Sequence, residues 1–337
     1  MATPTSMIAI AARTTGAAEV LVPAHLPTPV PGPGEVLIRV EAAGVNRADV
    51  LQRQGRYPID TGANPVLGLE VAGSIAALGA GVMDWAVGDR ICTLTNGGGY
   101  AQYAVAPAVQ LLRWPQGYDA VAAACLPEAC FTVWANVFQT GRLRAGETLL
   151  VHGGRGGVGS MAIQLAHALG ARVIATSGSD AGCRDCIALG ADHAINHQTQ
   201  DLAAAVLAAT GGHGVDVILD PVGAANLEGN LASLAPRGRL VLIGFTGGHL
   251  AESLDLTPIL ARQLVLTGSA MRPRSATEKG TIATELLARV WPLLDAGQCR
   301  PRLARVFPLA DAADAHRCME AGGYLGKIVL TVEPPAA

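Results

Sequence analysis

The chain has 337 residues, of which half are hydrophobic, and a formal net charge of −3. This length predicts two domains, and the slightly acidic balance offers no basic stripe for a nucleic acid. We find no apolar run near the roughly 20 residues that span a bilayer and no secretion signal, so we expect a cytoplasmic protein without a membrane partner. The seven cysteines are scattered and odd in number, which argues against a disulfide framework.

Residues 1–128 are rich in glycine, proline and short Val/Ile runs. Three strand-like runs are 35–40, 71–76 and 103–106, and turn signals such as Pro-Gly-Pro-Gly at 31–34 separate such runs. This texture predicts an irregular, mostly β domain.

Residues 129–271 alternate strand-like and helix-like runs. The strand at 148–152 precedes a helix at 159–169, and the strand at 171–175 precedes a helix at 183–189; further strands are expected at 215–219, 239–243 and 264–267. This alternation predicts βαβ units and a parallel sheet, as in a Rossmann domain. The tail, 272–337, has a predicted helix at 279–294 and a strand at 327–332. It is too short to fold alone, so we place it with residues 1–128 in one discontinuous domain.

A Cys-x-x-Cys pair stands within the second predicted helix of this region, at Cys183 and Cys186. Such a pair serves as a redox couple or half of a zinc site, or else is two helical cysteines of which one faces the core. The chain has no second Cys-x-x-Cys and no partner histidine cluster, so the structural interpretation is favoured.

A Gly-x-Gly-x-x-Gly motif follows the strand at 148–152 and opens the next helix. In this context it predicts a dinucleotide site. The glycines permit a tight turn and a close approach of the backbone to a diphosphate, and the helix N-terminus supplies N–H donors and a partial positive charge. The predicted contacts are Gly154, Gly156, Gly157, Val158 and Gly159.

The end of the second strand distinguishes NADP from NAD. NAD enzymes usually place a carboxylate there, about 20 residues beyond the first glycine, to hold the ribose 2′-hydroxyl. Residues 175–179 read Ala-Thr-Ser-Gly-Ser, without a carboxylate. Ser177 and Ser179 can donate to a 2′-phosphate, and Arg184 lies one turn further on. The serines can equally cap the next helix, and the two roles are compatible. We therefore predict NADP (NADPH), with some use of NAD.

Several motifs outside this region resemble the medium-chain dehydrogenase/reductase superfamily, and within it the zinc-independent, zeta-crystallin-like quinone oxidoreductases. The resemblance covers nearly the whole chain. It implies a GroES-like catalytic domain at 1–128 and 272–337 beside a Rossmann domain at 129–271. The motifs that carry it are Gly-Val-Asn-Arg-Ala-Asp at 44–49, Gly-Arg-Tyr-Pro at 55–58, Pro-Val-Leu-Gly-Leu-Glu-Val-Ala-Gly at 65–73, Val-Gly-Asp-Arg-Ile at 87–91, Leu-Gly-Ala-Asp at 189–192, Leu-Thr-Gly-Ser at 266–269 and Gly-Lys-Ile-Val at 326–329.

The same resemblance bears on metal chemistry. Zinc-dependent relatives carry cysteine where this chain has Asn46, histidine where it has Leu69, and a second cysteine near Glu128. An amide and a hydrocarbon cannot complete a tetrahedral N/S site, and only Cys92 lies in the stretch of the structural zinc lobe. We therefore expect no metal.

By resemblance, three catalytic candidates line the cleft near the nicotinamide: Asn46, Asp49 and Tyr57. The donors of Asn46 and Tyr57 can bond an acceptor carbonyl and stabilise developing negative charge. Each has an alternative role: Asn46 as a capping amide, Asp49 as a carboxylate at a helix N-terminus, and Tyr57 as a loop anchor before Pro58.

Further cofactor contacts follow from the resemblance and from the strand ends. These residues are Thr132, His197, Val222, Gly223, Gly244, Phe245, Ser269 and Lys327. Phe245 and Gly244 are placed over the nicotinamide, whereas Lys327 is alternatively a solvated surface charge. Many relatives carry a lysine near Gly182 for the 2′-phosphate, and this chain has none there, so its NADPH preference is expected to be modest.

The activity that these features imply is metal-free hydride transfer from NADPH to a quinone or an enone. An enoyl-thioester reductase is a second interpretation, and a non-catalytic nucleotide-binding crystallin or RNA-binding protein is a third. The resemblance also implies a homodimer joined through the Rossmann sheets.

Overall fold

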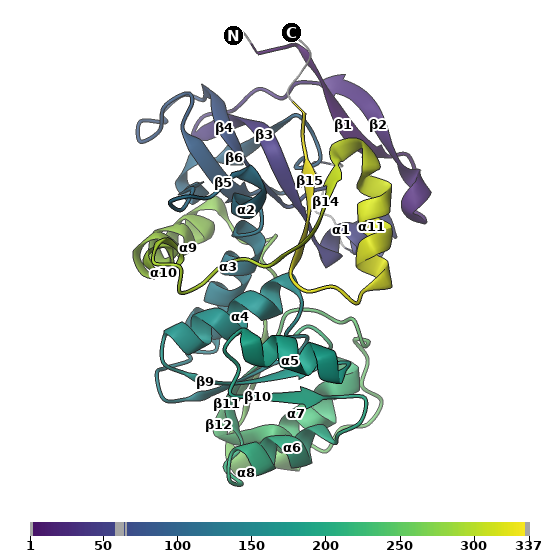
Figure 1. Cartoon of the computed structure of the whole chain (residues 1–337), viewed down its shortest axis with the longest axis vertical. Helices are drawn as coiled ribbons and strands as arrows, with labels where there is room; N and C mark the ends of the chain where they lie inside the picture. The colour runs from purple at the N-terminus through teal and green to yellow at the C-terminus, as the bar shows by residue number, and fades with distance from the viewer. Residues whose placement is uncertain (1–2, 58–63, 65, 334–337) are drawn as a thin grey trace. The chain divides into compact units, whose positions relative to one another are not determined.

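The computed structural model describes residues 3–57, 64 and 66–333, so Pro58 and Pro65, which belong to two of the motifs above, lie outside the described residues. The chain divides into two compact units (Figure 1). The first unit comprises residues 1–131, 272–295 and 301–337, and the second comprises 132–271 and 296–300. The division falls three residues after the predicted boundary at 128/129, and the tail segment 296–300 joins the second unit rather than the first.

The second unit is built on a six-stranded sheet in the order β10-β9-β8-β11-β12-β13. All five strand pairs are parallel, for example Leu149 beside Val173 and Ile218 beside Leu150. This is the 3-2-1-4-5-6 order of a Rossmann fold, so the predicted parallel sheet is confirmed. The strands are β8 (Thr148–Val151), β9 (Arg172–Ser177), β10 (His193–Asn196), β11 (Val215–Asp220), β12 (Leu234–Leu242) and β13 (Val265–Gly268).

Helices cover both faces of this sheet, with α4 and α5 on one side and α6, α7 and α8 on the other in Figure 1. The central strand β8 is buried at all four positions, as expected for a strand packed on two faces. The helical segments of the unit are η3 (Trp134–Thr140), α4 (Gly157–Ala168), α5 (Asp180–Ala188), α6 (Leu202–Ala209), η4 (Ala224–Asn226), α7 (Leu227–Ser233) and α8 (Thr257–Arg262).

The first unit is mostly β, as predicted. Its larger sheet has the order β14-β15-β3-β4-β5-β7, with β6 paired to β3, and β1 and β2 form a separate antiparallel pair. The strands are β1 (Ser6–Ala12), β2 (Leu21–Pro27), β3 (Glu35–Val45), β4 (Glu70–Leu78), β5 (Arg90–Leu94), β6 (Tyr103–Pro107), β7 (Leu112–Arg113), β14 (Leu303–Pro308) and β15 (Lys327–Thr331).

The helices of the first unit come from both its N-terminal and its C-terminal parts of the sequence. They are η1 (Ala18–Val20), α1 (Arg47–Arg53), η2 (Ala108–Gln110), α2 (Ala120–Ala123), α9 (Ala276–Arg289), α10 (Trp291–Asp295), η5 (Leu309–Asp311) and α11 (Ala312–Ala321), while α3 (Pro127–Val133) crosses from the first unit into the second. One apolar core joins β1, β3, β4, β6, β15 and α11, with Val36, Ile38 and Ile328 fully buried.

The single helix predicted at 279–294 is two helices. The first starts three residues earlier than predicted, because Ser275 and Glu278 form a capping box. It ends before Trp291-Pro292, where the proline has no N–H to continue the ladder. The expected strands did not include β1, β2, β5, β7, β10 and β14. Of these, β10 is only four residues long with two apolar residues, too short to show a period.

One expectation about the membrane needs correction. Consecutive helical segments from Ala120 to Thr140 form a 21-residue stretch with a mean hydropathy of 1.4, long and apolar enough to cross a bilayer. Small residues and interspersed polar ones divide this stretch into short apolar runs. Since 78% of its apolar window is buried within the protein, it has the character of a core helix.

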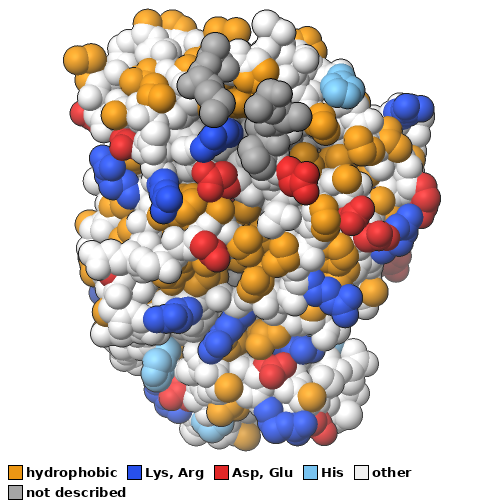
Figure 2. Space-filling model, turned by 45° about the horizontal axis from the view of Figure 1, so that its top comes forward, with side chains coloured by type: hydrophobic (Ala, Val, Ile, Leu, Met, Phe, Trp, Pro, Cys, Tyr) orange, Lys and Arg blue, Asp and Glu red, His pale blue; other side chains and the backbone are white. Residues whose placement is uncertain are grey.

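Charges on the surface are mixed. Figure 2 shows one face on which Lys and Arg are interspersed with Asp and Glu, with hydrophobic side chains between them. On this face, no single basic stripe of the kind that tracks a nucleic acid is visible.

Candidate active site

Most of the predicted cofactor residues of the second unit follow the carboxyl ends of its strands, at one edge of the sheet. Because its strands are parallel, their carboxyl ends meet there, and in this fold the ligand lies at that edge. The residues that follow the strands are Gly154, Gly156, Gly157, Val158 and Gly159 after β8, Ser177 and Ser179 at the end of β9, His197 after β10, Val222 and Gly223 after β11, Gly244 and Phe245 after β12, and Ser269 after β13.

The glycine-rich loop has one closed side and one open side. A Cβ added at Gly159 would lie 2.3 Å from the carbonyl oxygen of Gly153, so this glycine allows the helix to pack against the turn. A Cβ at Gly156 would meet only that same oxygen, at 3.5 Å, so space remains beside it. Gly156 is also the N-cap of the 12-residue α4 and has no side chain with which to cap it. The first N–H groups of α4 and the open backbone beside them therefore fit a diphosphate.

Beneath this loop runs a chain of buried polar groups that the sequence did not reveal. Asn230 donates from Nδ2 to Asp220 Oδ2 over 2.9 Å, and its Oδ1 lies 2.7 Å from His152 Nε2. His152 Nδ1 lies 3.2 Å from Thr176 Oγ1, which accepts from the Gly153 N–H. Asp220 Oδ1 accepts from the N–H of Val222. These hydrogen bonds thus join the glycine-rich loop to the loop after β11.

The donor and acceptor of each hydrogen bond in this series of buried polar groups can be assigned in only one way. The Asn230 amide nitrogen faces the Asp220 carboxylate, so its oxygen must accept from His152 Nε2–H. Nδ1 then accepts the Thr176 hydroxyl. Burial lowers the pKa of His152, which keeps the imidazole neutral, as this tautomer requires. His152 is therefore a positioning residue.

The end of β9 marks the adenosine side of the site. Ser177 is buried, and Ser179 caps α5 by accepting from the Gly182 N–H at 3.1 Å. The N–H of His197 donates to the Ser177 carbonyl, and its ring lies 3.4 Å from the Cβ position of Gly178. The capping role proposed for Ser179 is thus confirmed, and it leaves a hydroxyl proton for a ligand.

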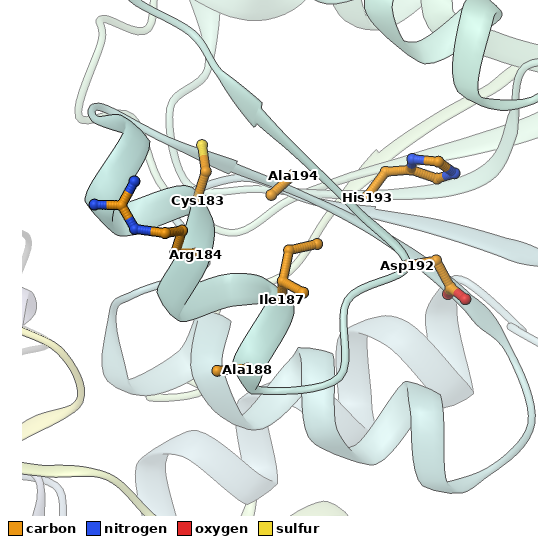
Figure 3. Close-up of a pocket in the computed structure, with 7 residues that line it drawn as sticks. All are labelled: Cys183, Arg184, Ile187, Ala188, Asp192, His193 and Ala194. Atoms are coloured by element: carbon orange, nitrogen blue, oxygen red, sulfur yellow. The ribbon is translucent and has the colours of Figure 1, made fainter.

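Arg184 lies elsewhere on α5. With Cys183, Ile187 and the start of β10 it lines an open pocket of about 460 Å³. Figure 3 shows its guanidinium pointing away from His193 and Ala194 in that pocket. Cys186 on the inner face of α5 is buried and Cys183 is partly exposed, and both are free thiols, as the structural interpretation of this pair predicts.

The loops after β11 and β12 lie against each other. The ring of Phe245 is 55% exposed, and a Cβ at Gly223 would lie 2.7 Å from it. Gly244 packs against the carbonyl oxygen of Pro221. The N–H of Ser269 donates to the carbonyl oxygen of Leu242. Thr132 is buried in α3, where its carbonyl accepts from Asn136 Nδ2.

In the first unit, Asn46 is held by an ion pair. Its Nδ2 donates to Glu70 Oε1 at 2.9 Å, and its Oδ1 accepts from Lys327 Nζ at 2.5 Å. Lys327 also contacts Glu70 Oε1 at 2.5 Å and the Val45 carbonyl at 3.4 Å. Glu70 Oε2 accepts from the Glu128 N–H. Residues distant in sequence thus fix the orientation of one amide.

Lys327 is not the solvated surface charge that was one of its two interpretations, because its side chain is only 5% exposed. Burial opposes the charged amine, but the Glu70 carboxylate outweighs it and raises the pKa of Lys327. The three N–H donors of the ammonium are matched by three acceptors within the first unit. Glu70 was missed as a site residue, although it stands inside a quoted motif beside Leu69.

Asp49 lies beside Asn46 and is fully buried. Its carboxylate accepts from the N–H of Asn46 at 2.8 Å, the N–H of Gly68 at 3.0 Å and the Tyr100 hydroxyl at 3.2 Å. Burial raises the pKa of Asp49 to about 6, against the opposing effect of the two backbone donors. These contacts fit the alternative role, a carboxylate that fixes the first turn of α1 and the Gly68 loop.

Tyr57 is partly exposed at the end of the described segment 3–57. The Arg272 guanidinium lies 5.7 Å from the centre of its ring, within reach of a cation–π contact. Arg272 itself donates to Gln52 Oε1 at 2.6 Å. Arg272 thus links the Tyr57 ring to α1.

Among the residues that the structure describes, no group of three or more His, Cys, Asp and Glu side chains is arranged to hold a metal ion. At the two positions discussed above, Leu69 is buried hydrocarbon and the amide of Asn46 is engaged by Glu70 and Lys327.

Comparisons with known families agree with this two-unit architecture. Residues 32–116 match the alcohol dehydrogenase GroES-like domain, and residues 157–288 match the family described as zinc-binding dehydrogenase. A 2-haloacrylate reductase of Burkholderia sp is 33% identical over 310 residues, covering 89% of this chain and 91% of that protein. The quinone oxidoreductase of Rattus norvegicus is 32% identical, with 90% of each chain covered.

Two solved structures have the same fold. A mycobacterial protein in complex with NADPH is 33% identical with a TM-score of 0.86, covering 96% of this chain and 100% of that one. A structure described as an NAD-dependent alcohol dehydrogenase has the same identity and TM-score, covering 97% and 100%.

The chain also matches one region of much larger proteins. A mycocerosic acid synthase-like polyketide synthase of Mycobacterium tuberculosis is 35% identical over 304 residues, which are 90% of this chain but 14% of the synthase. Over nearly its whole length, the chain is also matched by the reductase and the oxidoreductase named above, which are of similar size. It therefore belongs to the quinone oxidoreductase family of the medium-chain dehydrogenase/reductase oxidoreductases.

Proposed function

We propose that this protein is an NADPH-dependent reductase of quinones or enones that works without a metal. The observation that carries the proposal is Asn46, a buried amide oriented by Glu70 and Lys327 at a position where a metal-dependent relative needs a thiolate. An oriented N–H donor can stabilise negative charge on an acceptor oxygen, which is what reduction of a conjugated carbonyl requires.

The cofactor assignment is supported by the chemistry of the sheet edge. The glycine-rich turn and the open N-terminus of α4 fit a diphosphate, and the end of β9 presents serines instead of a carboxylate. A carboxylate there would repel a 2′-phosphate. A relative of the same fold is known with NADPH, which supports the same choice here. When bound, NADPH supplies the hydride.

On the acceptor side, we assign direct contact to Asn46 and Tyr57. Asn46 Nδ2 gives one N–H to Glu70, which leaves the other for an acceptor oxygen. Tyr57 offers a flat ring and a hydroxyl. Asp49 and Lys327 act as positioning residues, because their polar atoms are already bonded to groups of the first unit.

The proposed acceptors are compounds whose reduction by hydride needs no Lewis acid. A quinone or an enone is electron-poor before it binds, so hydride addition proceeds without polarisation by a metal. The relatives named quinone oxidoreductase and 2-haloacrylate reductase fit this class, since both names describe conjugated acceptors.

A second candidate function is enoyl-thioester reduction. It is favoured by the 35–36% identity to one region of mycobacterial polyketide synthases. The chemistry is the same hydride addition to a conjugated carbonyl, with a thioester in place of a ketone. Such an acceptor would also need contacts to its phosphopantetheine arm.

The test is a steady-state assay of the purified protein with NADPH and three acceptors: a benzoquinone, a simple enone and a crotonyl pantetheine thioester. We expect turnover of the quinone or the enone, undiminished by a chelator, and no stoichiometric zinc by elemental analysis. Asn46→Ala should lower kcat by about 10- to 100-fold, the usual effect of losing one oxyanion donor being up to 10³. Gln116→Ala, at an exposed amide of the same unit, is the matched control.

Three results would overturn the proposal. One zinc per chain together with loss of activity on chelation would show metal chemistry. Turnover of the thioester alone would select the second candidate. Full activity of Asn46→Ala would remove the assigned donor.

Two further proposals concern the state of the protein. Seven free cysteines suit a reducing compartment such as the cytoplasm. The strand β13 is at the edge of the six-stranded sheet with Val265 48% exposed, so we propose it as the contact of a homodimer. Sedimentation of wild type and Val265→Lys checks this proposal, which fails if both have the same mass.

A further inference from the structure

A cation lies at the end of β9, but it comes from the glycine-rich loop and not from α5. We propose that Arg155 recognises the 2′-phosphate of NADPH and so determines the cofactor preference. This inference rests on the proposed use of NADPH and adds the residue that reads its phosphate.

The first observation is that Arg155 crosses above the start of α5. A Cβ placed at Gly182 would lie 2.7 Å from Arg155 Cδ and 2.0 Å from Ser177 Oγ. The arginine stem, the Ser177 hydroxyl and the backbone of Gly182 therefore meet at one point. That point is the end of the second strand of the fold, where the 2′-substituent of the adenosine ribose is bound in Rossmann proteins.

The second observation is the partner of Arg155. Its Nε lies 2.9 Å from Asp185 Oδ2, and the two side chains are 26% and 36% exposed. Asp185 stands three residues beyond Gly182 on the same face of α5, so the ion pair draws the arginine across the helix. A partly exposed pair of this kind contributes little to stability. Arginine binds phosphates in a planar, bidentate geometry, so a guanidinium at this place suits a 2′-phosphate.

The third observation concerns Arg184, the competing cation, which lies on another side of α5. At 3.6 residues per turn, Asp185 is about 60° around α5 from Gly182, whereas Arg184 is about 200° away. Arg184 accordingly lines the pocket between α5 and the start of β10, with Cys183, Ile187 and Asp192. Figure 3 shows Arg184 on α5 with its guanidinium directed away from His193 and Ala194. The helix therefore separates Arg184 from the end of β9.

The test measures dissociation constants of NADPH, NADH, 2′,5′-ADP and 5′-AMP for wild type, Arg155→Gln, Arg155→Lys and Arg184→Gln. The two adenosine fragments differ only in the 2′-phosphate, so their ratio isolates its recognition. Arg155→Gln should weaken NADPH and 2′,5′-ADP by about 10- to 100-fold and leave NADH and 5′-AMP within about two-fold. Arg155→Lys should retain a large part of the preference. Arg172→Gln, at the opposite end of β9, is the matched control.

Several outcomes overturn the assignment. An equal loss of NADPH and NADH affinity in Arg155→Gln would place the arginine on the diphosphate. An unchanged ratio of 2′,5′-ADP to 5′-AMP affinity in that variant would remove it from the phosphate altogether. Loss of the preference in Arg184→Gln but not in Arg155→Gln would return the role to α5. If Arg155→Gln does not fold, Arg155→Lys and titration of wild type at rising salt still test the contact, because a phosphate–guanidinium bond weakens with ionic strength.

Failure of the underlying function looks different. If wild type itself binds 5′-AMP as tightly as 2′,5′-ADP, the proposed NADPH preference is wrong. If wild type prefers 2′,5′-ADP and Arg155→Gln keeps that preference, only the role of Arg155 is wrong.

Discussion

Replacing His316 by glutamine should change how the stability of the first unit depends on pH. His316 lies on α11, fully buried, with Nε2 3.1 Å from the Tyr100 hydroxyl and its ring edge-on to that of Tyr100. Tyr100 in turn donates to Asp49, the carboxylate that holds the backbone of Asn46 and Gly68. The hydroxyl proton is given to Asp49, so Nε2–H of His316 donates to the tyrosine oxygen.

The magnitude follows from the folded and unfolded pKa values. Burial lowers the pKa of His316 to about 4, from 6.5, and the nearby Arg53 guanidinium acts in the same direction. Because the folded pKa is the lower one, the unfolded chain binds the proton first as pH falls. The contribution is therefore present above pH 6.5 and is lost as the pH falls toward 4. At pH 5 the loss is about 2 kcal/mol, and it reaches about 3 kcal/mol below pH 4.

Glutamine keeps an N–H that can reach Tyr100 but does not titrate. His316→Gln should thus lie within about 1 kcal/mol of wild type at pH 7 and lose about 2 kcal/mol less than wild type between pH 7 and pH 5. Burial raises the pKa of Asp49 to about 6. Protonation of Asp49 therefore increases the stability of the fold as pH falls, which is opposite to the effect of His316. That effect is present in both proteins and cancels in the comparison.

The assay is urea unfolding followed by tryptophan fluorescence at pH 7 and pH 5. Three of the four tryptophans, Trp85, Trp114 and Trp291, belong to the first unit and report on it. His25→Gln, at an exposed position of β2, is the control and should behave as wild type. If His316→Gln loses as much stability as wild type between the two pH values, His316 is not the buried neutral imidazole described here.

Three further changes probe the second unit. Gly156→Leu should leave the fold intact, because a Cβ there meets only one atom at 3.5 Å, yet lower dinucleotide affinity by at least about 10-fold; unchanged affinity by fluorescence titration would refute the cradle. Asn230→Leu should lower stability by about 3 kcal/mol, since it leaves buried donor and acceptor groups of His152 and Asp220 unpaired; a thermal melt equal to that of wild type would contradict this. Ser177→Asp should shift the ratio of kcat/KM values toward NADH by about one to two decades, through repulsion of the 2′-phosphate; an unchanged ratio would show that the end of β9 is not the adenosine side.

Much of the second unit could be predicted because its signals are local. The strand, the glycine-rich turn and the helix that follows stand within about 20 residues, and each constrains the next. Alternation of apolar runs then predicts a parallel sheet, and a parallel sheet brings all its carboxyl ends to one edge. For this reason residues as far apart as Gly154 and Phe245 could be assigned to one site from the chain order alone.

The first unit was predicted less completely, because its site depends on long-range contacts. Asn46 and Lys327 are 281 residues apart, and β15 must pair with β3 before they can meet. No local pattern shows that Lys327 is buried, since an isolated lysine in a strand is usually exposed. Glu70 was likewise invisible as a partner until β3, β4 and β15 were placed side by side.

The contrast between Arg155 and Arg184 separates what the sequence determined from what only the tertiary structure could decide. The sequence by itself predicted a dinucleotide site at the edge of the sheet and showed that no carboxylate stands at the end of β9. Only the tertiary structure decided which arginine is near that end. Arg184 is closer in sequence, but the helical rotation from Gly182 turns it to the opposite face of α5. Arg155 is over 20 residues away in sequence, and it reaches the end of β9 because β8 and β9 are parallel neighbours whose loops emerge at the same edge.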